Sequence, residues 1–402
     1  MLNEKHAISL FGYGITTRAL AKKLGPSNFY DDNISKPHKD KEGHYLRPSN
    51  EFEAKYSTCE IPSPGMAPSH PLIKQAKNLI SEYDYFADSM PPSVWISGTN
   101  GKTTTTQMIQ TLLASHGSVA GGNIGTPLAE LDNQAPLWIL ETSSFTLHYT
   151  NKAVPQVYVL LPITPDHLYW HGSMAEYEQS KLKPLNMMQE GDAVLIPRKY
   201  QDYPTKAMKI CYETNEDLAE YFGIDISKLR FKGAFLQDAL LALGVSKILF
   251  DECDYERINA MPLDAHRQEE LQDKDGRLWV NDSKATNLDA TIQAVNTYKD
   301  KPLALILGGD DKGVDLSPLF ELLSGIEVTI YAIGKNESRI LELAKDFMIN
   351  AHGCKTLQTA CEKISNSYDK TSTVLLSPAA ASLDQFSSYG QRGDEFKKFA
   401  LL

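Results

Sequence analysis

The sequence predicts an α/β protein built from three units in series, because short apolar strands alternate with helical segments along its 402 residues. That length also exceeds what one hydrophobic core usually organises. We expect a Rossmann-like domain over residues 1–84, which would bind a substrate, and a central ATP-binding domain over 85–263. The central domain is expected to be of the phosphate-loop ATPase type with a mostly parallel sheet, and a second Rossmann-like domain is expected over 264–402.

The first unit is expected to open on a strand at 6–11, followed by the glycine turn GYG and the helical run ITTRALAKKL. Gly12 and Gly14 form a G-x-G pattern, but Thr17 stands where the dinucleotide fingerprint has its third glycine. A simple strand-to-helix turn and a nucleotide-binding turn therefore explain this motif equally well.

Further strands follow from short apolar runs. In the first unit, FYDD ends a second strand at 29–32, whereas residues 33–60 are polar and irregular and 61–71 form a loop rich in proline, glycine and serine. The central and last units are expected to contain strands at LWILE (137–141), VYVLLP (157–162), AVLIP (193–197), LWVNDS (278–283), ALILGG (304–309), VTIYAIG (328–334) and TVLLSP (373–378).

The stretch VWISGTNGKTTTTQMI, residues 94–109, indicates a phosphate-binding loop between a strand and a helix. Gly98 and Gly101 would let the backbone approach phosphate oxygens, and the N–H groups of the helix N-terminus attract an anion. Lys102 adds a positive charge, and the Thr103 hydroxyl is suited to Mg²⁺. One glycine of the full pattern is missing, but the G-x-x-G-K-T core favours nucleotide binding over a plain glycine turn.

The composition is that of an ordinary globular protein, with 42% hydrophobic and 23% charged residues and a net charge of −11. This charge does not attract polyanions, so we expect small-molecule substrates and no nucleic acid. Five cysteines without C-x-x-C spacing support neither a disulfide framework nor a structural zinc site. We find no secretory leader and no apolar run near the length needed to cross a bilayer. We therefore expect a cytoplasmic monomer without membrane insertion.

Two polar residues follow strands of the central unit, at the edge where open α/β sheets place their ligands. Glu141 ends LWILE, and His167 lies in ITPDH after VYVLLP. With Thr103 they form a candidate Mg²⁺ site, because this ion prefers oxygen ligands, although the imidazole is the less natural member. Taken singly, Glu141 is better interpreted as a solvated strand end, and His167 is equally well a loop histidine.

The last unit has two polar strand ends. NDSKATN (281–287) places six hydrogen-bonding side chains in seven residues, more than helix capping explains. LGGDDKG (307–313) has two consecutive glycines at the strand end, followed by Asp310 and Lys312, and a charged turn is the competing interpretation.

Taken together, these motifs resemble the Mur ligases of bacterial cell-wall synthesis, over essentially the whole chain. The motifs occur in the family's order and at about its spacing, and NDSKATN and SPAAASLDQF are similar to its D-glutamate-adding members. The full set is GTNGKTTTT, GGNIGTPL (121–128), ETSSF (141–145), ITPDH (163–167), HR (266–267), NDSKATN, LGGDDKG and SPAAASLDQF (377–386).

The resemblance implies an ATP-dependent ligase. ATP would phosphorylate the carboxylate of UDP-MurNAc-L-Ala, and the amine of D-glutamate would displace phosphate to form an amide. A carboxylate is a poor electrophile, and phosphorylation gives it a good leaving group. Electrostatic clamping by Mg²⁺ and lysine is what such phosphoryl transfer chiefly needs.

The resemblance also implies residue roles in the central domain. Lys102 and Thr103 would clamp the ATP phosphates and the metal, and Glu141 and His167 would complete the Mg²⁺ sites. The residues implied to bind the nucleotide are Gly98, Thr99, Asn100, Gly101, Lys102, Thr103, Thr104, His266 and Arg267.

In this family a lysine after the histidine motif is carbamylated and becomes a metal ligand, and AEYEQSK places it at Lys181. From the residues alone, Lys181 is a solvated helix lysine, and Lys183 is a rival for the role. The adenine pocket stays unassigned, because GAFLQDALLAL (233–243) lacks the asparagine that the family uses.

The same resemblance implies two substrate sites. The D-glutamate site consists of Thr286, Lys312, Ser382, Leu383 and Tyr389, with Lys284 and Asp282 close by. Lys312 and the hydroxyl groups suit an amino acid with two carboxylates. The uridine diphosphate site consists of Ile15, Thr16, Gly65 and Asn123. Asp32 and Asn33 replace a threonine-arginine pair common in relatives, which leaves the uracil contact open.

Two alternatives remain at this stage. The first keeps the chemistry and changes the amino acid, as in another Mur-type or a folylpolyglutamate-synthetase-like ligase. The second is a nucleotide-binding regulator or simple ATPase without ligation, which would leave the polar loops of the last unit without a purpose.

Overall fold

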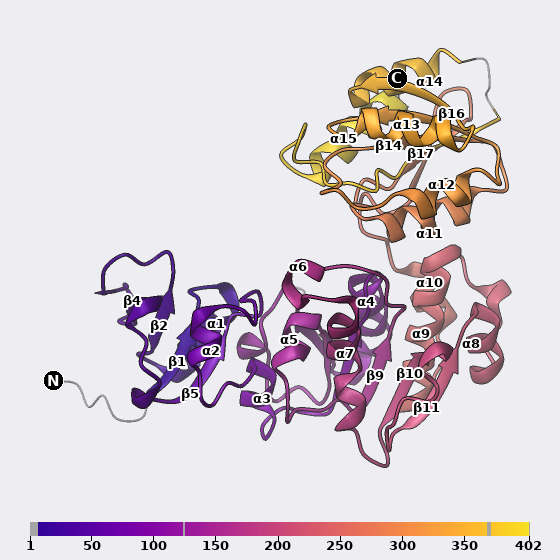
Figure 1. Ribbon diagram of the computed structural model, residues 1–402. Helices are drawn as coiled ribbons and strands as arrows, with labels where there is room; N and C mark the ends of the chain where they lie inside the picture. Colours follow the sequence, from indigo (N-terminus) through magenta and orange to yellow (C-terminus); the bar gives the residue numbers. More distant parts are fainter. Residues whose placement is uncertain (1–6, 124, 368–370, 402) are drawn as a thin grey trace. The chain divides into compact units, whose positions relative to one another are not determined.

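The computed structural model describes residues 7–123, 125–367 and 371–401 (Figure 1). It confirms an α/β fold with three mostly parallel sheets. The chain divides into two compact units: residues 1–230 with 237–261 form the first unit, and residues 231–236 with 262–402 form the second. The domain boundaries after residues 84 and 263 remain predictions. Parts of the predicted elements at positions 6 and 124 lie outside the described residues.

The first sheet has the strand order β3-β4-β2-β1-β5, in which only β3 is antiparallel to its neighbour. Residues 33–60, expected to be irregular, contain β3, β4 and most of β5, so that expectation was wrong. β3 is exposed and β4 and β5 are only partly buried, so their sequences lack an apolar run. The elements are β1 (Ala7–Phe11), α1 (Ile15–Leu24), β2 (Asn28–Asp31), β3 (His38–Lys39), β4 (Tyr45–Pro48), β5 (Ser57–Pro62), α2 (Pro71–Gln75) and α3 (Glu82–Phe86).

The central sheet is fully parallel, with the order β11-β10-β9-β6-β8-β7. The four strands nearest its centre are buried along their whole length, as their continuous apolar sequences predict. The two edge strands, β7 and β11, are partly exposed and were missed. The strands are β6 (Ser93–Ser97), β7 (Val119–Gly122), β8 (Trp138–Glu141), β9 (Val157–Leu160), β10 (Ala193–Pro197) and β11 (Met208–Tyr212). The helices are α4 (Lys102–Leu113), α5 (Ser144–Tyr149), α6 (Leu168–His171), α7 (Met174–Leu182), α8 (Asn215–Phe222), α9 (Gly233–Phe250) and α10 (Tyr255–Ala260).

The first and central sheets share one hydrophobic core. Leu10 and Leu20 of the first sheet and its helix belong to the same buried cluster as Trp95 and Leu140 of the central sheet. The Tyr149 hydroxyl also donates to the main-chain oxygen of Met66 at 2.7 Å. The first unit is therefore a single packed body that contains two sheets.

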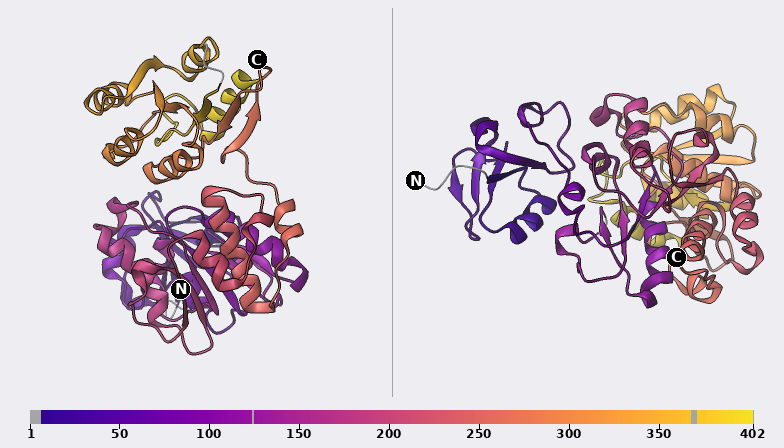
Figure 2. Two further views of the ribbon diagram at one scale, coloured as in Figure 1. Left: turned by 90° about the vertical axis from the view of Figure 1, so that its right-hand side faces the viewer. Right: turned by 90° about the horizontal axis from the view of Figure 1, so that it is seen from below.

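The third sheet has the order β12-β13-β17-β14-β15-β16, with only β12 antiparallel. Helices α11, α12 and α13 contribute to the core on one face and α14 and α15 to the core on the other, which gives the three layers seen in Figures 1 and 2. The elements are β12 (Glu269–Gln272), β13 (Leu278–Asn281), α11 (Leu288–Tyr298), β14 (Leu303–Leu307), α12 (Ser317–Leu323), β15 (Val328–Ile333), α13 (Glu337–Asp346), β16 (Asn350–Lys355), α14 (Leu357–Ser365), β17 (Thr373–Leu376) and α15 (Tyr389–Ala400). The sequence analysis identified all of these strands except β12 and β16, which have exposed positions.

Among the described residues, helix α9 alone is long and apolar enough to cross a membrane by length and composition, with a mean hydropathy of 1.5. This corrects the expectation that no apolar run approaches that length. Of this helix, 56% is buried inside the protein. Core helices of soluble proteins pass the same test, so one such helix is weak evidence for membrane insertion.

Glu82 is a buried acid at the junction of the first two sheets, and its Oε1 accepts the amide hydrogen of Ala129 at 3.2 Å. Burial raises the pKa of Glu82 to about 8, against the opposing effects of that hydrogen bond and of Lys23. Between the ordinary pKa of glutamate and about pH 8, the folded state keeps a proton that the unfolded state loses. The free energy of unfolding therefore falls as the pH rises through this window.

We predict that Glu82→Gln, which keeps the acceptor and removes the ionisation, raises the free energy of unfolding by about 1–3 kcal/mol at pH 7 and has little effect at pH 4. Urea unfolding from pH 4 to 8 measures the difference in the free energy of unfolding between the variant and the wild type. Glu130→Gln is the matched control, because the Glu130 side chain is 40% exposed and pairs with Lys22 at the surface. A constant difference across this pH range for Glu82→Gln would contradict the prediction.

Candidate active site

The predicted phosphate loop connects β6 to α4, and two of its glycines have no room for a side chain. Gly98 has φ 141°, and a Cβ there would lie 2.4 Å from the Leu161 Cβ. Gly101 has φ 84°, and a Cβ there would lie 2.7 Å from Oδ1 of Asp238. The loop thus combines left-handed backbone with close packing, which only glycine tolerates. Of the other predicted nucleotide contacts, Thr99 and Thr104 are buried and Asn100 is partly exposed.

Two lysines hydrogen-bond to one carbonyl oxygen of this loop. The Lys102 Nζ donates to the Gly98 oxygen at 3.0 Å and to the Thr99 oxygen at 2.7 Å. The Lys181 Nζ donates to the same Gly98 oxygen at 2.7 Å, and Lys181 is 1% exposed. Burial, with a further contribution from the Lys102 charge, lowers the pKa of Lys181 well below its ordinary value. Lys181 is therefore not the solvated helix lysine that its sequence position alone indicates.

The rival lysine, Lys183, is directed elsewhere. Its Nζ donates to the main-chain oxygen of His148 at 2.7 Å, and its side chain is only partly buried. Only Lys181 of the two is hydrogen-bonded to the phosphate loop.

Glu141 is 3% exposed, which corrects the interpretation of this strand end as solvated. Its Oε2 accepts the Thr103 hydroxyl hydrogen at 2.8 Å, and its Oε1 accepts the Asn123 amide hydrogen at 2.7 Å. The structure therefore brings Thr103 and Glu141 together at the start of α4. Their hydroxyl and carboxylate oxygens are the donor types that fit Mg²⁺. Asn123, assigned by resemblance to the uridine diphosphate, lies in this group.

His167 immediately precedes α6, with φ 53°. Its Nε2 lies 3.5 Å from Oδ2 of Asp166, and its ring lies 4.8 Å, centroid to centroid, from the Phe145 ring of the ETSSF segment. The two motifs that carry Glu141 and His167 are therefore neighbours at the C-terminal edge of the central sheet.

Asp238 is a residue of this site to which the sequence analysis gave no role. It is 4% exposed, and its Oδ1 accepts the Thr105 hydroxyl hydrogen at 2.9 Å, next to Gly101. The carboxylate therefore packs against the base of the phosphate loop. A single acid in the apolar run GAFLQDALLAL was the available signal, because buried carboxylates usually have specific partners.

The predicted uridine diphosphate site lies at the glycine turn of the first sheet. The Tyr13 amide donates to Oδ2 of Asp31 at 2.7 Å, and the Gly14 amide donates to the Thr17 hydroxyl at 3.1 Å, so both are occupied within the turn. The next residues, Ile15 and Thr16, begin α1, where N–H groups lack intrahelical acceptors. The predicted anion contacts of Ile15 and Thr16 are compatible with this geometry.

The remaining residues near this turn have partners of their own. The Gly65 oxygen accepts the Trp170 indole hydrogen at 3.0 Å. Asp32 pairs with Nε2 of His70 at 2.9 Å, and the pKa of Asp32 is lowered first by that hydrogen bond. The Asn33 side-chain amide donates to Oδ1 of Asp31 at 2.9 Å.

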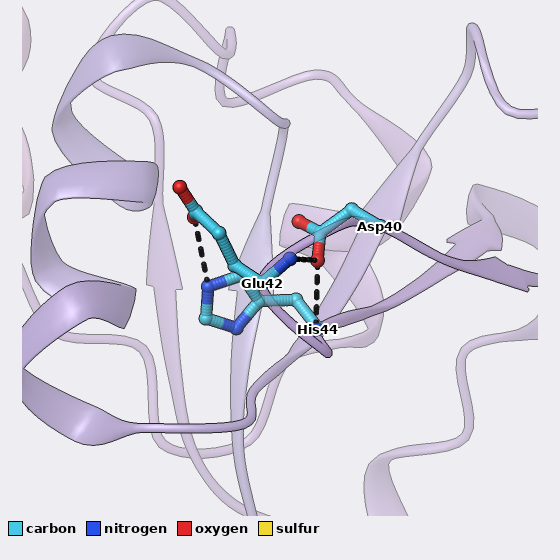
Figure 3. A group of neighbouring side chains, drawn as sticks. All are labelled: Asp40, Glu42 and His44. Atoms are coloured by element: carbon cyan, nitrogen blue, oxygen red, sulfur yellow. Dashed lines mark hydrogen bonds and ion pairs between the residues drawn. The ribbon is translucent and has the colours of Figure 1, made fainter.

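Asp40, Glu42 and His44 offer ligand atoms within 4.8 Å of one another, a spacing at which a cation can bind (Figure 3). However, Nδ1 of His44 accepts the Ser27 amide hydrogen, so Nε2 of the neutral ring carries the proton and faces Glu42 at 3.4 Å. The Asp40 carboxylate accepts two hairpin amides and the Tyr13 hydroxyl. This group closes the β3–β4 hairpin and does not suit a metal.

In the second unit, three loops meet at the C-terminal edge of the third sheet. The Ser377 hydroxyl donates to Oδ2 of Asp282 at 2.8 Å, and the backbones of Asp310 and Ala381 exchange two hydrogen bonds. These contacts join the loops that carry the predicted D-glutamate contacts. Thr286, Lys312, Leu383 and Tyr389 are exposed and Ser382 is buried.

His266 and Arg267 also belong to the second unit. Nδ1 of His266 lies 3.0 Å from the Asn281 side-chain nitrogen, and a Cβ at Gly393 would lie 2.2 Å from that Nδ1. Arg267 pairs with Asp264 at 3.6 Å. Their implied contact with the nucleotide remains a prediction.

Comparison with known proteins identifies relatives along the chain. The family model described as the Mur ligase middle domain matches residues 96–238. A UDP-N-acetylmuramoylalanine–D-glutamate ligase from Campylobacter jejuni subsp. jejuni strain 81-176 is 55% identical, covering 97% of this chain and 98% of the relative. The ligase of the same name from Helicobacter pylori strain HPAG1 is 46% identical, covering 98% and 99%. In fold, the chain is similar to the MurF ligase from Thermotoga maritima solved with ADP, with TM-score 0.58, 14% identity and coverage of 93% and 94%.

We predict that Gly101→Ala weakens nucleotide binding at least tenfold, because the added Cβ meets the buried Asp238 carboxylate at 2.7 Å. Gly223→Ala is the matched control: Gly223 has φ 64° but nothing within 4 Å of its Cβ position. Both variants should lose about 1–2 kcal/mol from left-handed backbone strain. Calorimetric titration with ATP measures the change in nucleotide affinity, and thermal unfolding measures the loss of stability from backbone strain. Equal nucleotide affinity in both variants would show that the Asp238 contact is unimportant.

Proposed function

Because the chain belongs to the Mur ligase family, we propose that it joins D-glutamate to UDP-N-acetylmuramoyl-L-alanine, with conversion of ATP to ADP and phosphate. The observation that carries the proposal is the 55% identity over 97% of the chain to a ligase named for this reaction. The phosphate loop, the Thr103–Glu141 pair and the three polar loops of the third sheet supply side chains for such a reaction.

The chemistry proceeds in two balanced steps. In the first, a carboxylate oxygen of UDP-MurNAc-L-Ala forms a bond to the γ-phosphorus of ATP while the bond to ADP breaks. In the second, the neutral amine of D-glutamate forms the C–N bond, the acyl C–O bond to phosphate breaks, and one amine proton leaves with the inorganic phosphate. Lys102 and the amides at the start of α4 would hold the transferred phosphoryl group, whose charge they match.

Thr103 and Glu141 would hold Mg²⁺ at this edge, with His167 on the neighbouring loop as a further ligand. When bound, the ion would offset phosphate charge and polarise the transferred group. The Thr103–Glu141 hydrogen bond would then be exchanged for metal contacts, so these two residues hold each other in place until the ion arrives.

Lys181 would act as its carbamate. A neutral amine attacks CO₂, forms an N–C bond and loses one proton, which converts a cation into an anion with oxygen ligands. The buried position of Lys181 beside Lys102 favours the neutral amine that this reaction requires. The carbamate would in turn pair with the Lys102 cation, which replaces a repulsion by an attraction.

The acceptor amino acid would bind at the loops of the third sheet through Lys312, Thr286, Ser382, Leu383 and Tyr389. The uridine diphosphate would bind at Ile15, Thr16, Gly65 and Asn123. We further propose that the enzyme works in the cytoplasm as a monomer, because ATP and nucleotide-linked substrates are supplied there. Size-exclusion chromatography with light scattering tests the monomer directly.

We predict that phosphate release from ATP and Mg²⁺ requires both UDP-MurNAc-L-Ala and an amino acid, and that D-glutamate is preferred within a panel of amino acids. Lys102→Ala should reduce turnover at least a thousandfold with an unchanged melting temperature. Preference for another amino acid would keep the chemistry and change the assigned acceptor. Release that needs neither substrate would overturn the ligase assignment.

Lys181 of α7 and Lys183, which follows that helix, provide a second test. Lys181→Met should reduce turnover at least a hundredfold, because it removes the carbamate, whereas Lys183→Met should retain most activity. Short-chain carboxylic acids should partly restore Lys181→Met but leave Lys183→Met unchanged. Full activity of Lys181→Met would exclude a carbamate at this position.

A further inference from the structure

Arg392 is a buried cation in α15 that joins two loops of the third sheet. It is 1% exposed. Its Nε donates to the Ser283 hydroxyl at 3.0 Å, and its Nη2 donates to the Ser283 main-chain oxygen at 2.8 Å and to the Ala380 oxygen at 3.2 Å. One guanidinium group therefore holds the segment after β13 and the segment after β17 at a fixed separation.

The hydrogen-bond partners of Arg392 are neutral. Within residues 371–401 and the other described ranges, no carboxylate hydrogen-bonds to it, and Asp384 acts only at longer range. Burial lowers the pKa of Arg392 to about 10, so the group stays charged at neutral pH. A buried charge without an ion-pair partner is costly, and structures retain one where its geometry is needed.

Ser283 also fixes the first residue of α15, the helix that carries Arg392. Its hydroxyl accepts from Arg392 and donates to the Tyr389 main-chain oxygen at 2.8 Å. The Lys284 ammonium lies 5.4 Å from the centre of the Tyr389 ring. Arg392 is thus linked, directly or through Ser283, to the segments that carry Thr286, Ser382 and Tyr389, the acceptor contacts of the proposed site.

We propose that Arg392 is a positioning residue for the acceptor amino acid: its forked guanidinium sets the spacing between the Ser283 and Ala380 segments on which the contacts to the D-glutamate carboxylates depend. This inference rests on the proposed function. In this role Arg392 acts through the two loops and not by contact with the substrate, because its side chain is 1% exposed.

The geometry of the guanidinium donors is the property that a substitution can test. Lysine would keep the charge, but one ammonium cannot reproduce bonds from both Nε and Nη2 to the two segments. Arg392→Lys should therefore raise the KM for D-glutamate roughly 10- to 100-fold, because a small displacement of positioning groups has effects of that size. The KM values for ATP and UDP-MurNAc-L-Ala should change less than twofold.

Arg277 provides the matched control. It is a second buried arginine of the third sheet, and it also donates to main-chain oxygens, those of Ile364 and Ser367. It immediately precedes β13, at the end of that strand opposite to the loops. Arg277→Lys should lower the melting temperature by an amount similar to that of Arg392→Lys and leave the KM for D-glutamate unchanged.

Ser283→Ala is a milder variant in case Arg392→Lys does not fold. It removes only the hydroxyl between Arg392 and Tyr389, and we expect a smaller rise in the KM for D-glutamate, about threefold to tenfold. The measurements are steady-state phosphate release by the full chain, with each substrate varied in turn, and thermal unfolding.

A selective rise in the KM for D-glutamate in Arg392→Lys and Ser283→Ala, absent from Arg277→Lys, supports the proposal. An unchanged KM for D-glutamate, or equal losses for all three substrates, would overturn it. If the wild type shows no turnover that depends on D-glutamate, the proposed function itself fails, and the two failures are thereby distinguished.

Discussion

The hydrogen bonds from two lysine side-chain nitrogens, those of Lys102 and Lys181, to one carbonyl oxygen, that of Gly98, are the constraint on which the central site depends. They require the left-handed backbone of Gly98 and its close approach to Leu161, which no other residue permits. They also place Lys181 in a buried position where its charged form is disfavoured. The Thr103–Glu141 pair lies beside this arrangement, so a phosphate-binding loop, an oxygen-rich ligand set and a reactive amine occupy one strand edge.

The third sheet uses buried polar groups in a comparable way. Asp282, whose pKa burial raises to about 7, accepts hydrogen bonds from Ser377 and from the Gln268 amide. Arg392 binds only neutral oxygens. Asp282 and Arg392 are both buried, whereas Thr286, Lys312 and Leu383 are exposed. Such buried networks fix a loop conformation at a cost in stability that apolar packing would not incur.

The fold class and the inner strands of the central sheet could be predicted from the sequence, because strands such as β9 and β10 are continuous apolar runs. Strands such as β4 and β16 could not be predicted, because β4 is mostly half-buried and β16 mostly exposed, so neither has a continuous apolar run. At the site, the phosphate loop followed from its motif and the candidate Mg²⁺ ligands Thr103, Glu141 and His167 from their positions after strands, whereas the remaining roles depended on resemblance to a family. The burial of Lys181 and the contact between Asp238 and Thr105 depend on packing between segments far apart in the chain, which local sequence does not report.

The shared core of the first two sheets limits how this protein can be divided. Leu10 and Leu20 pack in the same cluster as Trp95 and Leu140, and Tyr149 bonds to the Met66 backbone. Separating the first sheet from the central sheet would expose this apolar surface on both fragments. Recombination between relatives should therefore exchange these two sheets as one block, and a chimera that splits them must also replace the residues on both sides of the shared core.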